Sequence, residues 1–295
     1  MDIDIYLKKK RELVDGFLMK YLSSIKTNSS CPKYLYKSMS YSLMAGGKRL
    51  RPVLAIASYE ATGRKSKNML PVAAALELIH TYSLIHDDLP AMDNDDFRRN
   101  KPTNHRVFGE AIAILAGDAL LTDAFGIVAK ALNKPEMLIN IIRELTSACG
   151  SEGMVGGQTA DIVFEDKKIK KKELLYIHKQ KTGALIRASV RTGAIMAEAS
   201  PGVLSSMTKY GEKIGLAYQI IDDVLNIVGT KKELGKSTGT DSKRGKNTYP
   251  SVFGLEGSKK KAENLIKDSL NAIESFDEKA EPMREIAKYI LKRRN

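Results

Sequence analysis

Apolar residues recur at helical spacing along almost the whole chain, and this feature constrains the possible folds most. Strand-like alternation of apolar and polar residues is hard to find. No linker rich in glycine, serine or proline divides the chain, and no repeat of fixed period occurs. The spacing predicts helices over residues 70–89, 111–131, 138–148, 173–199, 205–228 and 259–276. We therefore expect an all-α fold in which residues 1–295 form a single domain.

The composition is that of a globular chain rather than a disordered or disulfide-built one. Of the 295 residues, 43% are hydrophobic and 28% are charged, which supplies enough apolar material for a large core. Cys31 and Cys149 stand far apart and match no metal-ligand spacing, so we expect reduced thiols. No apolar run approaches the roughly 20 residues of a membrane helix. The acidic start also lacks the order of a signal peptide. We expect a cytoplasmic protein without membrane insertion.

The formal net charge of +13 raises the question of a nucleic-acid partner. Residues 1–70 carry 14 basic and 5 acidic side chains, and residues 231–295 carry 16 and 10. The middle of the chain carries 18 basic and 20 acidic side chains, so the basic excess lies at the two ends. This distribution does not favour one continuous basic face, and we expect no nucleic-acid binding.

An acidic cluster follows the apolar segment 70–89 directly. Helical spacing places Glu77, His80 and Asp87 on one face of that helix. Asp93 lies six residues beyond Asp87, where a regular helix would turn it off this face. Pro90 stands between the two aspartates and predicts a distorted turn, which would bring Asp93 back beside Asp87.

A second cluster, Gln219, Asp222, Asp223 and Asn226, lies on another apolar helix. Carboxylates against apolar helix walls are costly unless a cation neutralises them. Carboxylate oxygens without histidine or cysteine favour a hard ion such as Mg²⁺, which in turn favours phosphate-bearing substrates. The alternative is that these aspartates are helix caps or solvated charges. Two such clusters on separate helices favour the metal interpretation.

Several further motifs occur in a fixed order between residues 34 and 255. They are 46–52 (GGKRLRP), Arg98-Arg99, Gly117-Asp118, Gly157-Gln158 with Asp161, Lys181-Thr182-Gly183, and Gly235-Lys236 through Asp241 to Lys246. In this combination the chain resembles the short-chain trans-isoprenyl diphosphate synthases, and among them the bacterial farnesyl diphosphate synthases. The resemblance implies a homodimer of polyprenyl synthetase domains, each an isoprenoid-synthase-type helical bundle around a central cavity.

The chemistry implied by this resemblance is a Mg²⁺-dependent prenyl transfer. Isopentenyl diphosphate condenses head to tail (1'-4) with dimethylallyl and then geranyl diphosphate, which gives (2E,6E)-farnesyl diphosphate. The allylic diphosphate ionises to a carbocation, the double bond attacks it, and the released diphosphate can take the proton. Fixed cations and metal ions stabilise the charge of the leaving group.

The resemblance also assigns roles to residues. Several Mg²⁺ ions, bound together with the allylic diphosphate, are expected at Asp87, Asp88, Asp93 and Asp222. Asn226 stands where the family usually has aspartate, so it is left out of this set. The allylic diphosphate is expected to contact Arg98, Lys181, Thr182, Gln219, Lys236 and Lys246. Of these, Lys181, Thr182 and Gln219 are the expected catalytic residues. Isopentenyl diphosphate is expected at Lys48, Arg51, His80 and Arg99.

Each of these residues also has a plainer interpretation. The basic run at 48–51 fits a solvated loop, His80 fits a satisfied core histidine, and Arg98 with Arg99 would offset the preceding aspartates. The joint order of the motifs favours the functional interpretation. The terminal residues 292–295 either close over bound diphosphate, as the family's tails do, or remain solvated, and we expect them to be solvated.

The length of the product is expected to depend on Tyr82 and Ser83, five and four residues before Asp87. Five residues of helix span about 7.5 Å. In the family the product grows down an apolar tunnel beneath the first acidic motif, so the Tyr82 phenol is expected to form its floor. The alternative is that Tyr82 only fills core space.

Four other functions are alternatives to farnesyl diphosphate synthesis. Geranylgeranyl diphosphate synthesis on the same fold also suits the sequence around Asp93. A terpene cyclase would not need the basic set at Lys48, Arg51 and His80. A non-catalytic regulatory subunit of a prenyl synthase is disfavoured because both acidic motifs are present. A nucleic-acid-binding protein is motivated by charge alone.

Overall fold

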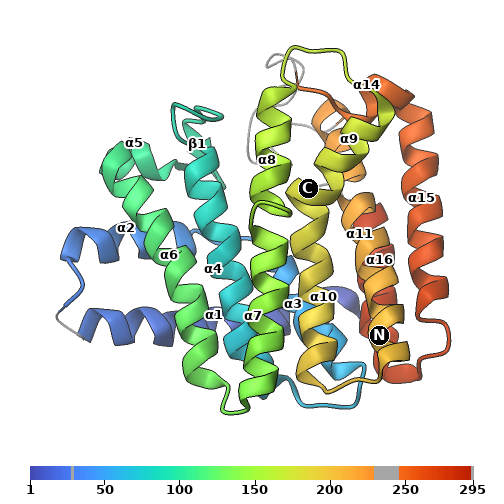
Figure 1. The fold of residues 1–295 in the computed structure, drawn as a ribbon, viewed down its shortest axis with the longest axis horizontal. Helices are drawn as coiled ribbons and strands as arrows, with labels where there is room; N and C mark the ends of the chain where they lie inside the picture. Colours follow the sequence, from blue (N-terminus) through green and yellow to red (C-terminus); the bar gives the residue numbers. More distant parts are fainter. Residues whose placement is uncertain (28–29, 229–245, 294–295) are drawn as a thin grey trace.

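The computed structural model describes residues 1–27, 30–228 and 246–293, and Figure 1 shows their arrangement. The first half contains α1 (Ile3–Thr27), α2 (Lys33–Leu43), α3 (Leu50–Glu60), the 3₁₀ helix η1 (Ser66–Met69), α4 (Leu70–Asp87), α5 (Asn104–Phe108), α6 (Glu110–Ala131) and α7 (Pro135–Cys149). The second half contains α8 (Met154–Val163), α9 (Lys171–Ile177), the π-helix η2 (His178–Gly183), α10 (Ala184–Met196), α11 (Pro201–Val228), α14 (Tyr249–Phe253), α15 (Leu255–Ala272), the 3₁₀ helix η3 (Glu278–Ala280) and α16 (Glu281–Lys292).

The all-α prediction is confirmed, and the structure departs from it in two details. Strands β1 (Phe97–Arg98) and β2 (Lys101–Pro102) form a small antiparallel hairpin that the sequence analysis did not predict. The helix expected over 173–199 begins at Lys171 and is divided by η2 into α9 and α10. Residues 178–183 carry no strongly apolar side chain, so the apolar spacing on either side of them gave no sign of the wider turn.

The core consists of two hydrophobic clusters that share two helices. One cluster surrounds α4, α6 and α7, and the other surrounds α11, α15 and α16. Helices α3 and α10 contribute buried side chains to both clusters and pack against each other. Eleven of the 18 residues of α4 are buried, as expected for a helix that is apolar on nearly all sides. Helix α4 is therefore a core element whose end carries the first acidic motif.

Within the described residues, α6 is the one helix long and apolar enough to cross a membrane by length and composition. Asp118 and Asp123 interrupt its apolar run, which is why run length in the sequence did not reveal it. One face of α6 packs on α4, and 33% of its most apolar window is buried. Its opposite face carries Ile114 and Leu115, which are 43% and 53% exposed. Helix α6 thus combines a core face with an exposed apolar face.

A buried ion pair joins the N-terminal helices. Arg49 precedes α3 with a left-handed backbone (φ 51°) that turns its side chain into the protein. Its guanidinium donates to Glu77 of α4 at 2.7 Å, to Asp15 of α1 at 2.8 Å, and to the Leu43 carbonyl of α2 at 2.7 Å. The side chains of Arg49 and Glu77 are each 1% exposed. The pair therefore fixes four helices at one point.

Removing one partner of this pair is expected to destabilise the protein more than removing both. Glu77→Leu leaves the Arg49 guanidinium buried without its main counter-charge, and we expect a loss of about 3–5 kcal/mol in the free energy of unfolding. The double variant Arg49→Met/Glu77→Leu is expected to lose less, because no unpaired charge remains buried. Urea unfolding of the three proteins measures both quantities. A double variant less stable than Glu77→Leu would contradict this account.

Candidate active site

Most of the candidate site residues that the structure describes gather at one end of the helical bundle. Helices α4 and α11 end there, α10 begins there, and β1 and α14 lie at the same end (Figure 1). Residues far apart in the sequence thus meet where several helices terminate.

The first acidic motif folds back on itself, as predicted. After Asp87 the chain leaves the helix, and the Asp93 backbone N–H donates to the Asp87 carbonyl oxygen at 2.8 Å. Burial raises the pKa of the Asp87 carboxyl, and the neighbouring Asp93 raises it further, while Lys181 opposes both. The turn from Asp87 to Asp93, here called the acidic corner, therefore concentrates negative charge where water is largely excluded.

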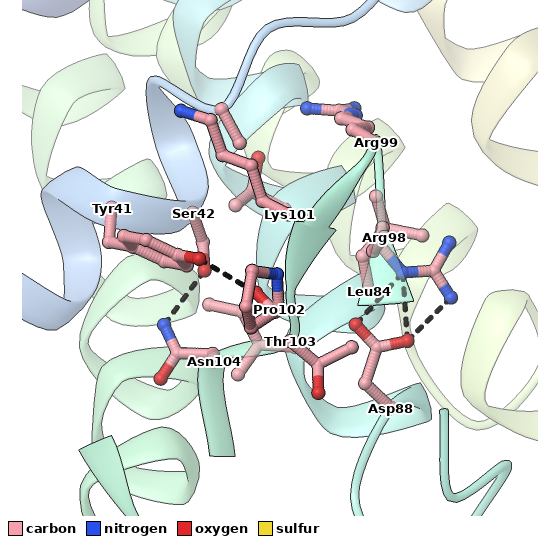
Figure 2. Close-up of a pocket in the computed structure, with 13 residues that line it drawn as sticks. Tyr41, Ser42, Leu84, Asp88, Arg98, Arg99, Lys101, Pro102, Thr103 and Asn104 are labelled. Carbon is pink, nitrogen blue, oxygen red and sulfur yellow. Dashed lines mark hydrogen bonds and ion pairs between the residues drawn. The ribbon is translucent and has the colours of Figure 1, made fainter. Parts of the chain in front are cut away.

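The hairpin after this turn sends two consecutive arginines in different directions (Figure 2). Arg98 clasps the Asp88 carboxylate with its Nε, 2.8 and 2.9 Å from the two oxygens. Burial raises the pKa of the Asp88 carboxyl, and Arg98 counteracts this rise. Arg99 donates to the Gly46 carbonyl and lies 4.0 Å from Glu77. Gly47 has a φ of 123°, a backbone conformation that favours glycine, and a Cβ there would also come within 2.7 Å of the Arg99 guanidinium.

Two lysines approach the acidic corner from other elements. Lys181 of η2 donates to Asp161 of α8 at 2.6 Å, and Lys246 donates to Asp93 at 2.6 Å. Although burial alone would lower it, the pKa of Lys181 is raised by Asp161 and Asp87. Gly157 permits this contact between elements, since a Cβ there would lie 2.1 Å from the Lys181 backbone nitrogen. Lys181 is therefore held charged, and both lysines lie beside the first acidic motif.

Two of the three predicted catalytic residues, Thr182 and Gln219, are in direct contact. The Thr182 hydroxyl donates to Gln219 Oε1 at 2.6 Å, and Gln219 Nε2 donates to Asp223 at 2.8 Å. Thr182 and Asp223 are buried, whereas Gln219 is half-buried. Asn226, one turn beyond Asp222, is also buried.

Arg293, in the segment 292–295, enters the site, contrary to the expected solvated tail. Residues 294 and 295 lie outside the described residues. Arg293 is buried and donates to Asp222 and to the Tyr218 carbonyl, and its guanidinium lies 3.8 Å from the centre of the Tyr218 ring. Burial lowers the pKa of Lys48 to about 8, and the charge of Arg293 contributes to this lowering. The expectation fails because Asp222 and the face of Tyr218 give the guanidinium both a counter-charge and a stacking surface.

Of the expected isopentenyl diphosphate residues, Arg51 lies on α3 and His80 on α4, while Lys48 precedes α3 and Arg99 follows β1 in the hairpin. His80 and Arg51 are enclosed, and His80 Nδ1 and Arg51 Nε have no hydrogen-bond partner in the described part of the chain. Burial, with added repulsion from Arg51 and Arg99, holds the pKa of His80 well below its usual range. His80 is therefore a neutral imidazole among cations. It differs from a core histidine whose ring nitrogens are both hydrogen-bonded, because its Nδ1 has no partner among the described residues.

The two candidate chain-length residues differ in their surroundings. Tyr82 is 6% exposed and meets the His86 ring edge-on, with centroids 5.8 Å apart. Burial raises the pKa of Tyr82, and Cys149 and Asp87 add to the rise. The Ser83 hydroxyl instead donates to the His80 carbonyl of its own helix at 2.9 Å. The phenol is thus the group that occupies the interior near Asp87. Lys236 lies outside the described residues.

The carboxylates suit Mg²⁺ that arrives with a diphosphate. Among the residues that the structure describes, no group of three acidic, histidine or cysteine side chains is preassembled around a metal position. Instead Asp88, Asp93 and Asp222 each hold a cation, namely Arg98, Lys246 and Arg293. Mg²⁺ commonly takes one or two carboxylates and completes its shell with water and substrate phosphate oxygens. This donor set therefore fits the ion.

Three residues of this region were not assigned a role from the sequence. Asp161 stood within a motif, and the structure places it on Lys181. His178 gave no signal beyond its residue type, and Arg293 stood in the terminal segment 292–295, which was expected to be solvated. Only their contacts with Asp223 and Asp222 connect them to the site.

Comparison with known proteins identifies the chain further. Residues 32–290 match the family described as Polyprenyl synthetase. The chain is 47% identical over 293 residues to a geranylgeranyl diphosphate synthase of Cyanophora paradoxa, covering 98% of this chain and 96% of that one. It is 44% identical over 271 residues to a farnesyl diphosphate synthase of Bacillus subtilis, covering 91% and 90%. A geranyltransferase from Helicobacter pylori, complexed with magnesium and isoprenyl diphosphate, matches with a TM-score of 0.79 at 31% identity, covering 96% of each chain.

The helical fold and these matches define a prenyltransferase that acts on isoprenyl diphosphates. The chain belongs to the polyprenyl synthetase family, and it is a short-chain prenyl diphosphate synthase. Members of this family use Mg²⁺ with their diphosphate substrates.

Proposed function

We propose that this enzyme condenses isopentenyl diphosphate 1'-4 with dimethylallyl and then geranyl diphosphate, and that it stops at (2E,6E)-farnesyl diphosphate. The observation that carries this product length is the buried phenol of Tyr82, five residues before Asp87 on α4. About 7.5 Å of helix separates the two positions. A fifteen-carbon chain growing from the acidic corner would meet this ring.

We propose the same assignment of residues to Mg²⁺ and to the two diphosphate substrates that the sequence suggests. Asp87, Asp88, Asp93 and Asp222 would hold the Mg²⁺ ions, which neutralise the leaving diphosphate when bound. The cations Arg98, Lys181 and Lys246, already paired with carboxylates of the site, would turn to the allylic diphosphate. Lys236 is kept in this set on the strength of its motif.

The remaining cations would bind isopentenyl diphosphate. Lys48, Arg51 and Arg99 lie on the α3 side of the site with neutral His80. Arg51 Nε and His80 Nδ1 have no partner within the described residues, which supports a polar ligand there. Thr182 and Gln219 would direct oxygen lone pairs to the developing carbocation. No strong base is needed, because the departing diphosphate accepts the proton.

Geranylgeranyl diphosphate synthesis is the second candidate. It is favoured by the 47% identity to the Cyanophora paradoxa enzyme, a higher value than that to the Bacillus subtilis enzyme. The two products differ by one added five-carbon unit, so the same reaction mixture distinguishes them.

The purified protein, incubated with Mg²⁺, dimethylallyl diphosphate and isopentenyl diphosphate, is expected to give farnesyl diphosphate as its main product. Chromatography of the dephosphorylated products measures chain length. Chelation of Mg²⁺ should abolish turnover, because the leaving-group charge is then uncompensated. A main product of twenty carbons would select the second candidate, and no condensation at all would contradict both.

Shortening the Tyr82 side chain is expected to lengthen the product. In Tyr82→Ala the phenol no longer blocks the chain, so twenty-carbon and longer products should appear in the same assay. Ser83→Ala removes only a small side chain whose hydroxyl is bonded within its own helix, so we expect it to change chain length less than Tyr82→Ala. Farnesyl diphosphate alone from Tyr82→Ala would remove Tyr82 as the floor of the tunnel.

We also propose that the enzyme is a homodimer joined through the exposed face of α6. Ile114 and Leu115 lie on this face, and burying them against a second copy removes apolar surface from water. Light scattering is expected to give twice the 32.6 kDa mass of one chain. Leu115→Glu should shift the protein toward the monomer, while Ile5→Glu, on exposed α1, should not. A wild-type monomer would contradict the proposal.

A further inference from the structure

Asp223 lies behind Thr182 and Gln219, and it accepts hydrogen bonds from Gln219 and from the Tyr249 backbone of α14. It is 4% exposed, and its Oδ1 accepts from Gln219 Nε2 at 2.8 Å. Its Oδ2 accepts from the Tyr249 backbone N–H at 2.7 Å and lies 3.3 Å from Nε2 of His178. The side chain is therefore held by α14 and η2 while it holds Gln219.

The surroundings of His178 indicate which of its ring nitrogens carries the proton. Burial lowers the pKa of His178 to about 4, so the ring is neutral at physiological pH and carries a single N–H. A carboxylate only accepts hydrogen bonds, so the proton is on Nε2, which faces Asp223. The ring also stacks on Tyr249, with centroids 6.0 Å apart. His178 is thus held with its Nε2 facing Asp223 and its ring against Tyr249.

This arrangement decides which way the Gln219 amide points. Since the carboxylate can only accept, the NH₂ of Gln219 must face Asp223. Its Oε1 then faces Thr182, whose hydroxyl donates to it at 2.6 Å. Rotating the amide by 180° would place Oε1 against the Asp223 carboxylate, two acceptors facing each other, whereas the Thr182 hydroxyl could still accept from Nε2. Asp223 therefore orients Gln219, and Gln219 orients the Thr182 hydroxyl.

We propose that His178 and Asp223 are positioning residues for prenyl transfer, which hold the oxygens of Gln219 and Thr182 toward the carbocation. The inference rests on the proposed catalytic roles of Gln219 and Thr182. It explains why a buried histidine begins η2: the same π-turn carries Lys181 and Thr182, so His178 anchors the segment that supplies them.

The test compares His178→Leu, which removes the donor, with His178→Gln, whose amide can replace Nε2–H. We expect His178→Leu to lower kcat about 10- to 100-fold, because the oriented oxygens act in the transition state. KM for both substrates should stay within about twofold. His178→Gln should recover most of the rate. In a Gln219→Leu background, His178→Leu should cost no more than about twofold in addition.

A direct readout of the Gln219 orientation does not depend on activity. The chain has three glutamines, Gln158, Gln180 and Gln219, so ¹⁵N-glutamine labelling gives three side-chain amide signals. Gln219→Leu identifies the signal of Gln219. His178→Leu is expected to move that signal and to leave the other two in place. Asp223→Asn provides the same test if His178→Leu fails to fold.

The outcomes distinguish the positioning role of His178 and Asp223 from the catalytic role proposed for Gln219. An unmoved Gln219 signal, or equal losses of kcat from His178→Leu in the wild-type and Gln219→Leu backgrounds, would overturn the positioning role. A moved signal together with wild-type kcat in Gln219→Leu supports the orientation of Gln219 by His178, and it overturns the catalytic role proposed for Gln219.

Discussion

The buried ion pair between Arg49 and Glu77 is the interaction on which the geometry of one half of the site depends. A carboxylate that is 1% exposed requires a cation, and Arg49 supplies it from the turn between α2 and α3. Because Glu77 also lies 4.0 Å from Arg99, its charge attracts the hairpin toward the glycine turn at residues 46–47. The pair thus connects helix packing with the placement of a substrate-binding cation.

In the other half of the site, three carboxylates are paired with cations before any substrate arrives. Asp88, Asp93 and Asp222 are each paired with a basic side chain, and those contacts come from the hairpin, from the chain after residue 245, and from the C-terminus. Mg²⁺ and diphosphate can therefore bind as the carboxylates and the basic side chains exchange partners. No buried charge of either sign is then left without a counter-charge.

Most of the fold and much of the site could be predicted from sequence, and the failures have physical reasons. Apolar spacing located α4, α6 and α11, and Pro90 indicated the turn that returns Asp93 to Asp87. The hairpin was missed because strands of two residues leave no alternation to detect. The wrong prediction for Arg293 arose because a terminal arginine reveals nothing of the Tyr218 ring and Asp222 that receive it.

The π-turn at residues 178–183 also limits how this stretch of sequence can change in length. A π-turn contains one residue more than the α-turn it replaces. Deleting one residue there would restore a regular helix and rotate α9 by about 100° relative to α10. His178 could then no longer face Asp223 while Thr182 faces Gln219. We therefore expect insertions and deletions to accumulate in the loop at 164–170, ahead of α9, and to be excluded from the turn itself.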